Sequence, residues 1–169
     1  VGSETVGRGT GGSWGGKDAV HGICAKTGKL VWVTRDIHPA SGFTSAEDLY
    51  IMQGLVWFGC NMSKRDTGVV TGLDPMSGEV VKQFGTETRG WHHRCHPGKA
   101  TEKYLISSWA RGTEYIDVAE EYWHPTVKWL RSACLYGMMP ANGFSYFLPH
   151  PCQCNPEGQI TGYNAFSAE

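Results

Sequence analysis

Short runs of β-branched and aromatic residues recur along the chain and are separated by turn residues. Residues 49–51 and 55–59 flank Gln53-Gly54, and a similar run covers 103–108. Asn142-Gly143 lies between two more apolar runs, a strong signal for a hairpin. The two dense blocks of the second half, 91–101 and 129–154, lack the apolar spacing of an amphipathic helix. The pattern therefore predicts an all-β protein.

One strand–turn–strand phrase occurs four times within this pattern. Its clearest copies are 21–32 and 71–81, and weaker copies are 114–118 and 161–166. A side-chain oxygen at the turn can accept backbone N–H bonds, and a following glycine such as Gly28 or Gly78 supplies a positive φ. The aligned turn positions are Cys24, Asp74, Asp117 and Asn164.

The copies lie about 40 to 50 residues apart, a spacing typical of the blades of a β-propeller. This predicts a β-propeller segment of about four blades, each a four-stranded antiparallel sheet, over residues 17–169. Residues 1–16 are glycine-rich and are expected to form an irregular lead-in. Propellers typically have four to eight blades. We therefore expect the remaining propeller blades, or another chain, to complete the ring.

Composition and charge narrow the classes of function. The chain has 169 residues, of which 40% are hydrophobic and 18% charged, so it can bury a core. It carries 15 Lys and Arg against 16 Asp and Glu, a net charge of −1. No basic face is implied, so nucleic acid is not expected as a partner. No apolar run approaches the ~20 residues of a membrane span, so none is expected.

Histidine, cysteine and arginine are concentrated in the two dense blocks of the second half. A histidine there could act as an acid or base while an arginine holds an anionic substrate. The alternative is that the arginines pair with carboxylates such as Glu102 and Glu114 where two blades meet. The candidate catalytic residues are His92, His93, Arg94 and Arg131.

Imidazole and thiolate groups in the same blocks also suit Zn or Cu. The candidate metal ligands are His92, His93, Cys95, His150, Cys152 and Cys154. Disulfides are the competing prediction, with three possible connectivities among Cys95, Cys134, Cys152 and Cys154. Free thiols are the third possibility. Cys24 and Cys60 are expected to be buried as small hydrophobic residues.

Aromatic residues in the second half allow two interpretations. Trp91, Trp109, Trp123 and Trp129 could stack on the faces of sugars. The preferred interpretation is that they fill the packing layers between blades.

The turn phrases resemble the Ala-x-Asp-x-x-Thr-Gly-Lys-x-x-Trp repeat of PQQ-type (quinoprotein-like) propellers, a family that includes alcohol dehydrogenases and outer-membrane assembly factors. The second half resembles the C-terminal part of planctomycete-type propeller proteins, through residues 92–95, 99–105, 134–137, 139–143 and 149–154. The resemblance implies an exported bacterial protein, periplasmic or extracellular. Cys152-Gln153-Cys154 departs from the adjacent cysteines of PQQ dehydrogenases, so no PQQ is expected in this segment.

These observations favour an exported PQQ-like propeller segment that acts as a binding or structural module, with a protein or a glycan as its ligand. Two alternatives remain open. The first is an enzyme, either a quinone-linked oxidoreductase or a carbohydrate-active enzyme, that uses the His/Cys/Arg-rich block. The second is a metal-binding protein that holds Zn or Cu.

Overall fold

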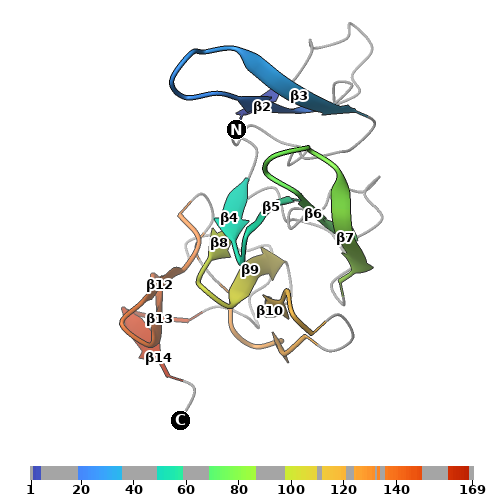
Figure 1. Cartoon of the computed structure of the whole chain (residues 1–169). Helices are drawn as coiled ribbons and strands as arrows, with labels where there is room; N and C mark the ends of the chain where they lie inside the picture. The colour runs from blue at the N-terminus through green and yellow to red at the C-terminus, as the bar shows by residue number, and fades with distance from the viewer. Residues whose placement is uncertain are drawn as a thin grey trace, which may run out of the picture.

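The computed structural model describes residues 2–4, 19–35, 49–58, 69–86, 98–109, 112–120, 124–131, 133, 136–149 and 160–167. The regular secondary structure in these ranges consists of strands (Figure 1). The described part of the chain contains no helix able to cross a membrane. The predicted all-β class is confirmed.

The first half of the chain contributes two antiparallel sheets. The first consists of β1 (Gly2–Glu4), β2 (Ala19–Ile23) and β3 (Leu30–Arg35). The second consists of β4 (Tyr50–Met52), β5 (Leu55–Phe58), β6 (Val69–Leu73) and β7 (Val80–Gly85). Each strand pairs with its neighbours in the sequence, so both sheets are simple meanders.

The second half repeats this arrangement with two further meanders. The third sheet consists of β8 (Lys99–Ala100), β9 (Tyr104–Trp109), β10 (Gly112–Asp117) and β11 (Thr126–Val127). The fourth consists of β12 (Met139–Ala141), β13 (Phe144–Phe147) and β14 (Asn164–Phe166). The hairpin predicted at Asn142-Gly143 joins β12 to β13, and both of its residues have a positive φ.

The four sheets follow one another in space in the order of the sequence. Figure 1 shows the first at the top, the second and third in the middle and the fourth at the lower left. Successive antiparallel meanders packed in this way are the blades of a β-propeller, so the predicted propeller segment is confirmed. The second and third sheets have the four strands expected, whereas the first and fourth have three within the described residues.

The beginning of the chain differs from the predicted irregular lead-in. Within residues 1–16, Gly2–Glu4 forms β1 and pairs with β2, with Ser3 opposite Val20. The exposed backbone groups of an edge strand can pair with any nearby extended segment, which explains why a stretch without a strand-like pattern forms one. The boundary proposed at residue 17 stays a prediction.

The two clear copies of the turn phrase have the predicted geometry. Asp74 follows β6, and its Oδ1 accepts the N–H groups of Met76 at 2.7 Å and Ser77 at 2.8 Å. Gly78 has a φ of 76° and donates its N–H to the Asp74 carbonyl. Gly28, with a φ of 67°, makes the same backbone bond to Cys24. The tight turns predicted at Gly28 and Gly78 are confirmed.

The weaker copies differ from one another. Asp117 ends β10 and accepts the Ala119 N–H at 3.0 Å, as the phrase predicts. Asn164 instead begins β14, and its Nδ2 donates backward to the carbonyl of Thr161. The fourth match is therefore wrong, because the strand begins at Asn164 instead of ending there.

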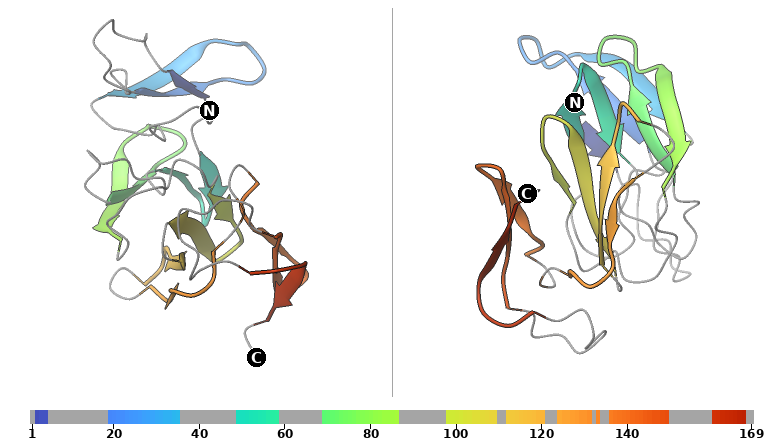
Figure 2. Two further views of the ribbon diagram at one scale, coloured as in Figure 1. Left: turned by 180° about the vertical axis from the view of Figure 1, so that it is seen from behind. Right: turned by 90° about the horizontal axis from the view of Figure 1, so that it is seen from below.

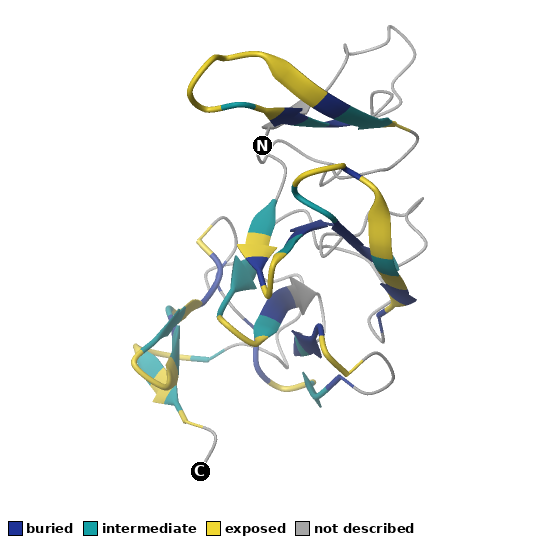
Figure 3. Cartoon of the chain, viewed as in Figure 1, coloured by how far each residue is buried: buried dark blue, intermediate teal, exposed yellow. Residues whose placement is uncertain are grey.

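Hydrophobic side chains gather where consecutive sheets meet. One cluster joins Val20 and Trp32 of the first sheet to Val56 and Leu73 of the second. Two similar clusters join the second sheet to the third and the third to the fourth. The outer strands β3 and β7 are largely exposed (Figure 3). The core therefore consists of layers between sheets.

Trp32 closes the junction between the first two sheets. Its Nε1 donates to the Pro75 carbonyl at 3.0 Å, within the turn that follows β6. Thr34, two residues further along β3, donates its hydroxyl to the carbonyl of Gly78. A Cβ atom on Gly22 or on Gly78 would collide with the indole ring. The ring therefore fits here because both of its neighbours are glycines.

Candidate functional site

Most residues of the predicted His/Cys/Arg-rich site lie outside the described part of the structure. Those residues are His92, His93, Arg94, Cys95, Cys134, His150, Cys152 and Cys154. Their catalytic, metal-binding and disulfide roles, and their expected proximity to one another, stay predictions. Among the described ranges, no group of three or more His, Cys, Asp or Glu side chains could hold a metal ion.

Arg131 is the one predicted site residue that the structure describes. Its side chain is fully buried, next to Leu130, whose carbonyl accepts the Thr113 hydroxyl at 2.9 Å. Glu114, on β10, is also fully buried. Both Arg131 and Glu114 take part in interactions, as buried charged groups require. Arg131 thus lies buried in the segment that follows β11, and a catalytic role for it stays a prediction.

Cys24 occupies the turn position that Asp74 holds in the second sheet. It is a free thiol and half-buried, rather than buried as a small hydrophobic residue. Hydrogen bonds from the side chain and backbone of Thr27, and from the backbone of Lys26, lower the pKa of the thiol. The thiol therefore takes the place of the carboxylate as acceptor in the turn.

A cavity of about 890 Å³ lies between the third and fourth sheets. Figure 2 shows, in its right-hand view, that the fourth sheet stands to one side of the other three. β12 lies next to β8, so the two sheets meet along these strands. The residues of the cavity come from β9, β10 and the segment after β11 on one side, and from β12 to β14 on the other.

Aromatic rings from the third sheet form one wall of the cavity. Tyr104 on β9 and Tyr115 on β10 make an edge-to-face contact, with ring centroids 6.2 Å apart. Trp129 follows β11 and is 59% exposed. Its ring contacts Phe166 of β14 at 5.6 Å, so it bridges the two sheets while presenting much of its surface to solvent.

The opposite wall comes from the hairpin of the fourth sheet. Phe144 follows the turn at Asn142-Gly143 and is 43% exposed. It lies against Tyr146 on one face of β13, while Phe147 packs on Phe166 on the other face, which Ser145 shares. Alternation along β13 therefore places Phe147 in the core. The exposed aromatic side chains of the cavity come from both sheets.

One hydrogen bond joins the two walls. The Tyr115 hydroxyl donates to the Ser145 Oγ at 3.1 Å. Burial raises the pKa of Tyr115, against the lowering effect of this hydrogen bond, so its hydroxyl is neutral at physiological pH. Both hydroxyls line the cavity. A neutral tyrosine and a serine can each form further hydrogen bonds with a ligand.

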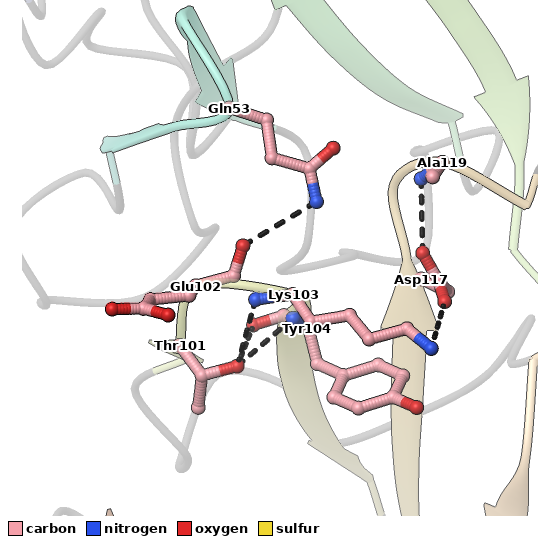
Figure 4. A network of polar contacts seen from close by, with 7 residues as sticks. All are labelled: Gln53, Thr101, Glu102, Lys103, Tyr104, Asp117 and Ala119. Carbon is pink, nitrogen blue, oxygen red and sulfur yellow. Dashed lines mark hydrogen bonds and ion pairs between the residues drawn. The ribbon is translucent and has the colours of Figure 1, made fainter.

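The turn between β8 and β9 forms the rim of the cavity (Figure 4). The Thr101 hydroxyl accepts the Tyr104 N–H at 2.9 Å, and the Gln53 side chain donates to the Glu102 carbonyl at 3.3 Å. Lys103 reaches across to Asp117, with its Nζ 3.0 Å from Oδ2. These contacts tie the rim to both β10 and the second sheet.

The ion pair of the rim is asymmetric in its exposure. The side chain of Lys103 is 59% exposed, whereas that of Asp117 is 6% exposed. Burial by itself would raise the pKa of Asp117, but the Ala119 N–H and the Lys103 ammonium outweigh it and lower the pKa. The hydrogen bond to Asp117 raises the pKa of Lys103. Both groups are therefore charged at neutral pH.

Sequence reasoning found parts of this cavity but not the cavity itself. Trp129 was a candidate for stacking on sugars, although packing between blades was preferred. The hairpin at Asn142-Gly143 was also predicted. The signal that was missed is the density of aromatic residues on both sides of this hairpin. That density becomes a site only because the third and fourth sheets face each other across the cavity.

Comparison with solved structures finds chains of similar fold. The chain is similar to the crystal structure of BamB from Moraxella catarrhalis, with a TM-score of 0.49 and 18% sequence identity. The match covers 76% of this chain and 40% of the BamB chain, so the present chain corresponds to less than half of that structure. No protein-family model matches the sequence, and neither does any curated protein.

Proposed function

We propose that the chain is a segment of an exported, PQQ-like β-propeller that acts as a binding module. The observation that carries the proposal is the aromatic cavity between the third and fourth sheets. Its volume of about 890 Å³ falls within the range of ligand sites, about 300 to 1,000 Å³. The ligand is bound between the two sheets rather than chemically changed.

Exposed aromatic side chains support binding at this place. Trp129 and Phe144 expose apolar surface where they line the cavity, and a ligand bound there would remove that surface from water. At the junction of the first two sheets, by contrast, Trp32 is buried. The burial of a tryptophan therefore differs between these two junctions, so the cavity does not follow from the repeat as such.

The PQQ-like and exported parts of the proposal are supported by the repeated turn phrase and by the cysteines of the second half. Disulfides persist in oxidising compartments such as the periplasm. Counting free thiols in the unreduced, denatured protein tests this. Two free thiols, Cys24 and Cys60, among the six cysteines would support two disulfides and hence export. Six free thiols would contradict the disulfides.

Completion of the ring by further blades, or by another chain, is part of the same proposal. It is supported by the number of sheets, since four is the smallest number of blades typical of propellers. Light scattering of the chain at several concentrations tests whether copies of it associate. A closed monomeric ring made of this chain alone would contradict this part.

The binding proposal is tested with panels of glycans and peptides on the purified chain. We expect saturable binding of one class, which Ala141→Trp abolishes by filling the cavity with an indole ring. Ile51→Trp is the matched control, because Ile51 is 73% exposed on β4 and lies outside the cavity. Binding that survives Ala141→Trp would contradict the cavity as the site, and conversion of the ligand would favour an enzyme.

A further inference from the structure

We infer that the cavity between the third and fourth sheets binds a neutral oligosaccharide of β-linked hexoses. This inference rests on the proposed function and names the class of its ligand. It is carried by the aromatic faces, the hydrogen-bonding groups and the charge of the cavity.

The aromatic faces suit a flat, amphipathic ligand. A β-linked hexose with equatorial hydroxyls has two flat faces of C–H groups, and its hydroxyls point outward around the ring edge. Trp129 and Phe144 belong to the lining from different sheets, and both are partly exposed. Stacking against such rings removes apolar surface of both partners from water. Trp129, which meets Phe166 across the gap between the sheets, offers one such face next to the hydrogen-bonding groups of the cavity.

Neutral hydrogen-bonding groups lie between and beside these aromatic rings. The Tyr115 hydroxyl donates to Ser145, so the Ser145 hydrogen and the Tyr115 oxygen can bond to a ligand. The Asn142 side chain, which offers both a donor and an acceptor, is at the tip of the hairpin. Sugar hydroxyls both donate and accept, and therefore match a lining of this mixed kind.

The charge of the lining favours a neutral ligand. The charged residues among the described part of the lining are Glu102 and Lys103. The Lys103 ammonium already pairs with Asp117, so the cavity offers no excess of positive charge to a phosphate or carboxylate. A proline-rich peptide also docks on aromatic grooves. However, it has few donors and would leave the half-buried Tyr115 oxygen poorly satisfied.

The test is calorimetric titration of the whole chain with cellohexaose and chitohexaose, with a proline-rich decapeptide as the competing probe. We expect one of the hexasaccharides to bind. Trp129→Ala should weaken binding about tenfold, since a stacking platform is removed. Asn142→Gly should weaken it several-fold, because glycine keeps the positive φ of 52° while the amide is lost. Tyr163→Ala is the matched control, since Tyr163 is 84% exposed and lies outside the cavity.

The outcomes separate this inference from the proposed function. Binding of a hexasaccharide that is weakened by Trp129→Ala and Asn142→Gly, but not by Tyr163→Ala, supports the inference. Should Trp129→Ala fail to fold by circular dichroism, Asn142→Gly alone decides. Binding of the peptide and of neither sugar overturns the inference and leaves the binding module intact. If a broad ligand panel also gives no binding at millimolar concentration, both proposals fail.

Discussion

A tryptophan lies at the junction of the first two sheets and another at the junction of the last two, but they are buried to different extents. Where the first and second sheets meet, Trp32 is 9% exposed and is held by the turn that follows β6. Where the third and fourth sheets meet, Trp129 is 59% exposed and lines a cavity. Each tryptophan contacts the next sheet along the chain, yet only one of them is buried.

The size of the neighbouring residues accounts for this difference. Gly22 and Gly78 leave room for the indole of Trp32, so the first two sheets close on it. In the third and fourth sheets, Trp129 meets Phe166, and Tyr115 meets Ser145 across the gap. These contacts bridge the two sheets without filling the space between them. A closed junction therefore stabilises the fold, whereas an open one creates room for a ligand.

The strongest test of this contrast replaces each tryptophan in turn. Trp32→Ala should lower the free energy of unfolding by about 3 to 5 kcal/mol, because a large ring leaves a cavity in a closed layer. Trp129→Ala should lower it by about 1 kcal/mol or less, because most of the ring is already in water. Urea denaturation of both variants measures the difference. Equal losses would contradict the division into a closed and an open junction.

The next test enlarges the glycines instead of removing the ring. Gly78→Ala should lower the free energy of unfolding by about 2 to 4 kcal/mol. Alanine disfavours the left-handed backbone that Gly78 adopts, and its Cβ would collide with Trp32. Gly28→Ala is the matched control: its φ of 67° is similar, but no atom lies near the added Cβ, so about 1 kcal/mol is expected. The two variants are compared by thermal denaturation. The difference between their losses of stability measures the effect of the collision with Trp32 alone. A difference near zero would show that Trp32 moves aside freely.

At the rim of the cavity, the Lys103–Asp117 ion pair is expected to change the free energy of unfolding less than the two preceding substitutions do. This contribution depends on pH. The lowered pKa of Asp117 stabilises the fold above the unfolded value of about 3.9, and this contribution is lost as pH falls through the folded pKa. Asp117→Asn should therefore destabilise the protein slightly at pH 7 and flatten its stability profile between about pH 5 and pH 2.

Urea midpoints measured across this pH range provide the check, with Lys103→Gln as the companion variant. Removal of the lysine should leave part of the profile, because the Ala119 N–H still lowers the pKa of Asp117. If the pH dependence of stability is the same in Asp117→Asn as in the wild type, other carboxyl groups cause the loss of stability at acidic pH.

The smallest effect is expected at the first turn, where the sulfur of Cys24 replaces a carboxylate. Cys24→Asp should raise the melting temperature slightly, because an aspartate there can accept two backbone N–H bonds as Asp74 does. In the wild type, the lowered pKa of the Cys24 thiol should move the half-point of its alkylation by iodoacetamide below the usual pH. A lower melting temperature in Cys24→Asp would contradict the equivalence of the two turns.

Local signals were sufficient for much of the fold. The strands around Gln53-Gly54 and the turns at Gly28 and Gly78 could be predicted because each depends on a few adjacent residues. The pairing of Gly2–Glu4 with β2 could not, since its register depends on an edge strand rather than on the segment itself. The match at Asn164 failed because the phrase does not show whether the strand precedes or follows this residue, and β14 begins there.

The candidate site was less accessible to sequence reasoning. The sequence predicts a site in the His/Cys/Arg-rich block, because these residues carry reactive groups. The cavity instead depends on Tyr104, Tyr115 and Phe144, whose composition is the same as that of an ordinary core. Whether such rings are buried or exposed is decided by the distance between two sheets, which no local pattern encodes.

The position of the core layers between the sheets also bears on how the molecule opens. Because each layer is shared by two neighbours, the stability of a sheet depends chiefly on nearest-neighbour contacts, as in repeat proteins. Among the described residues, the second and third sheets take part in two layers, whereas the fourth takes part in one. In this chain without further blades, amide hydrogen exchange should then be faster in β12 to β14, which line the cavity, than in β4 to β11.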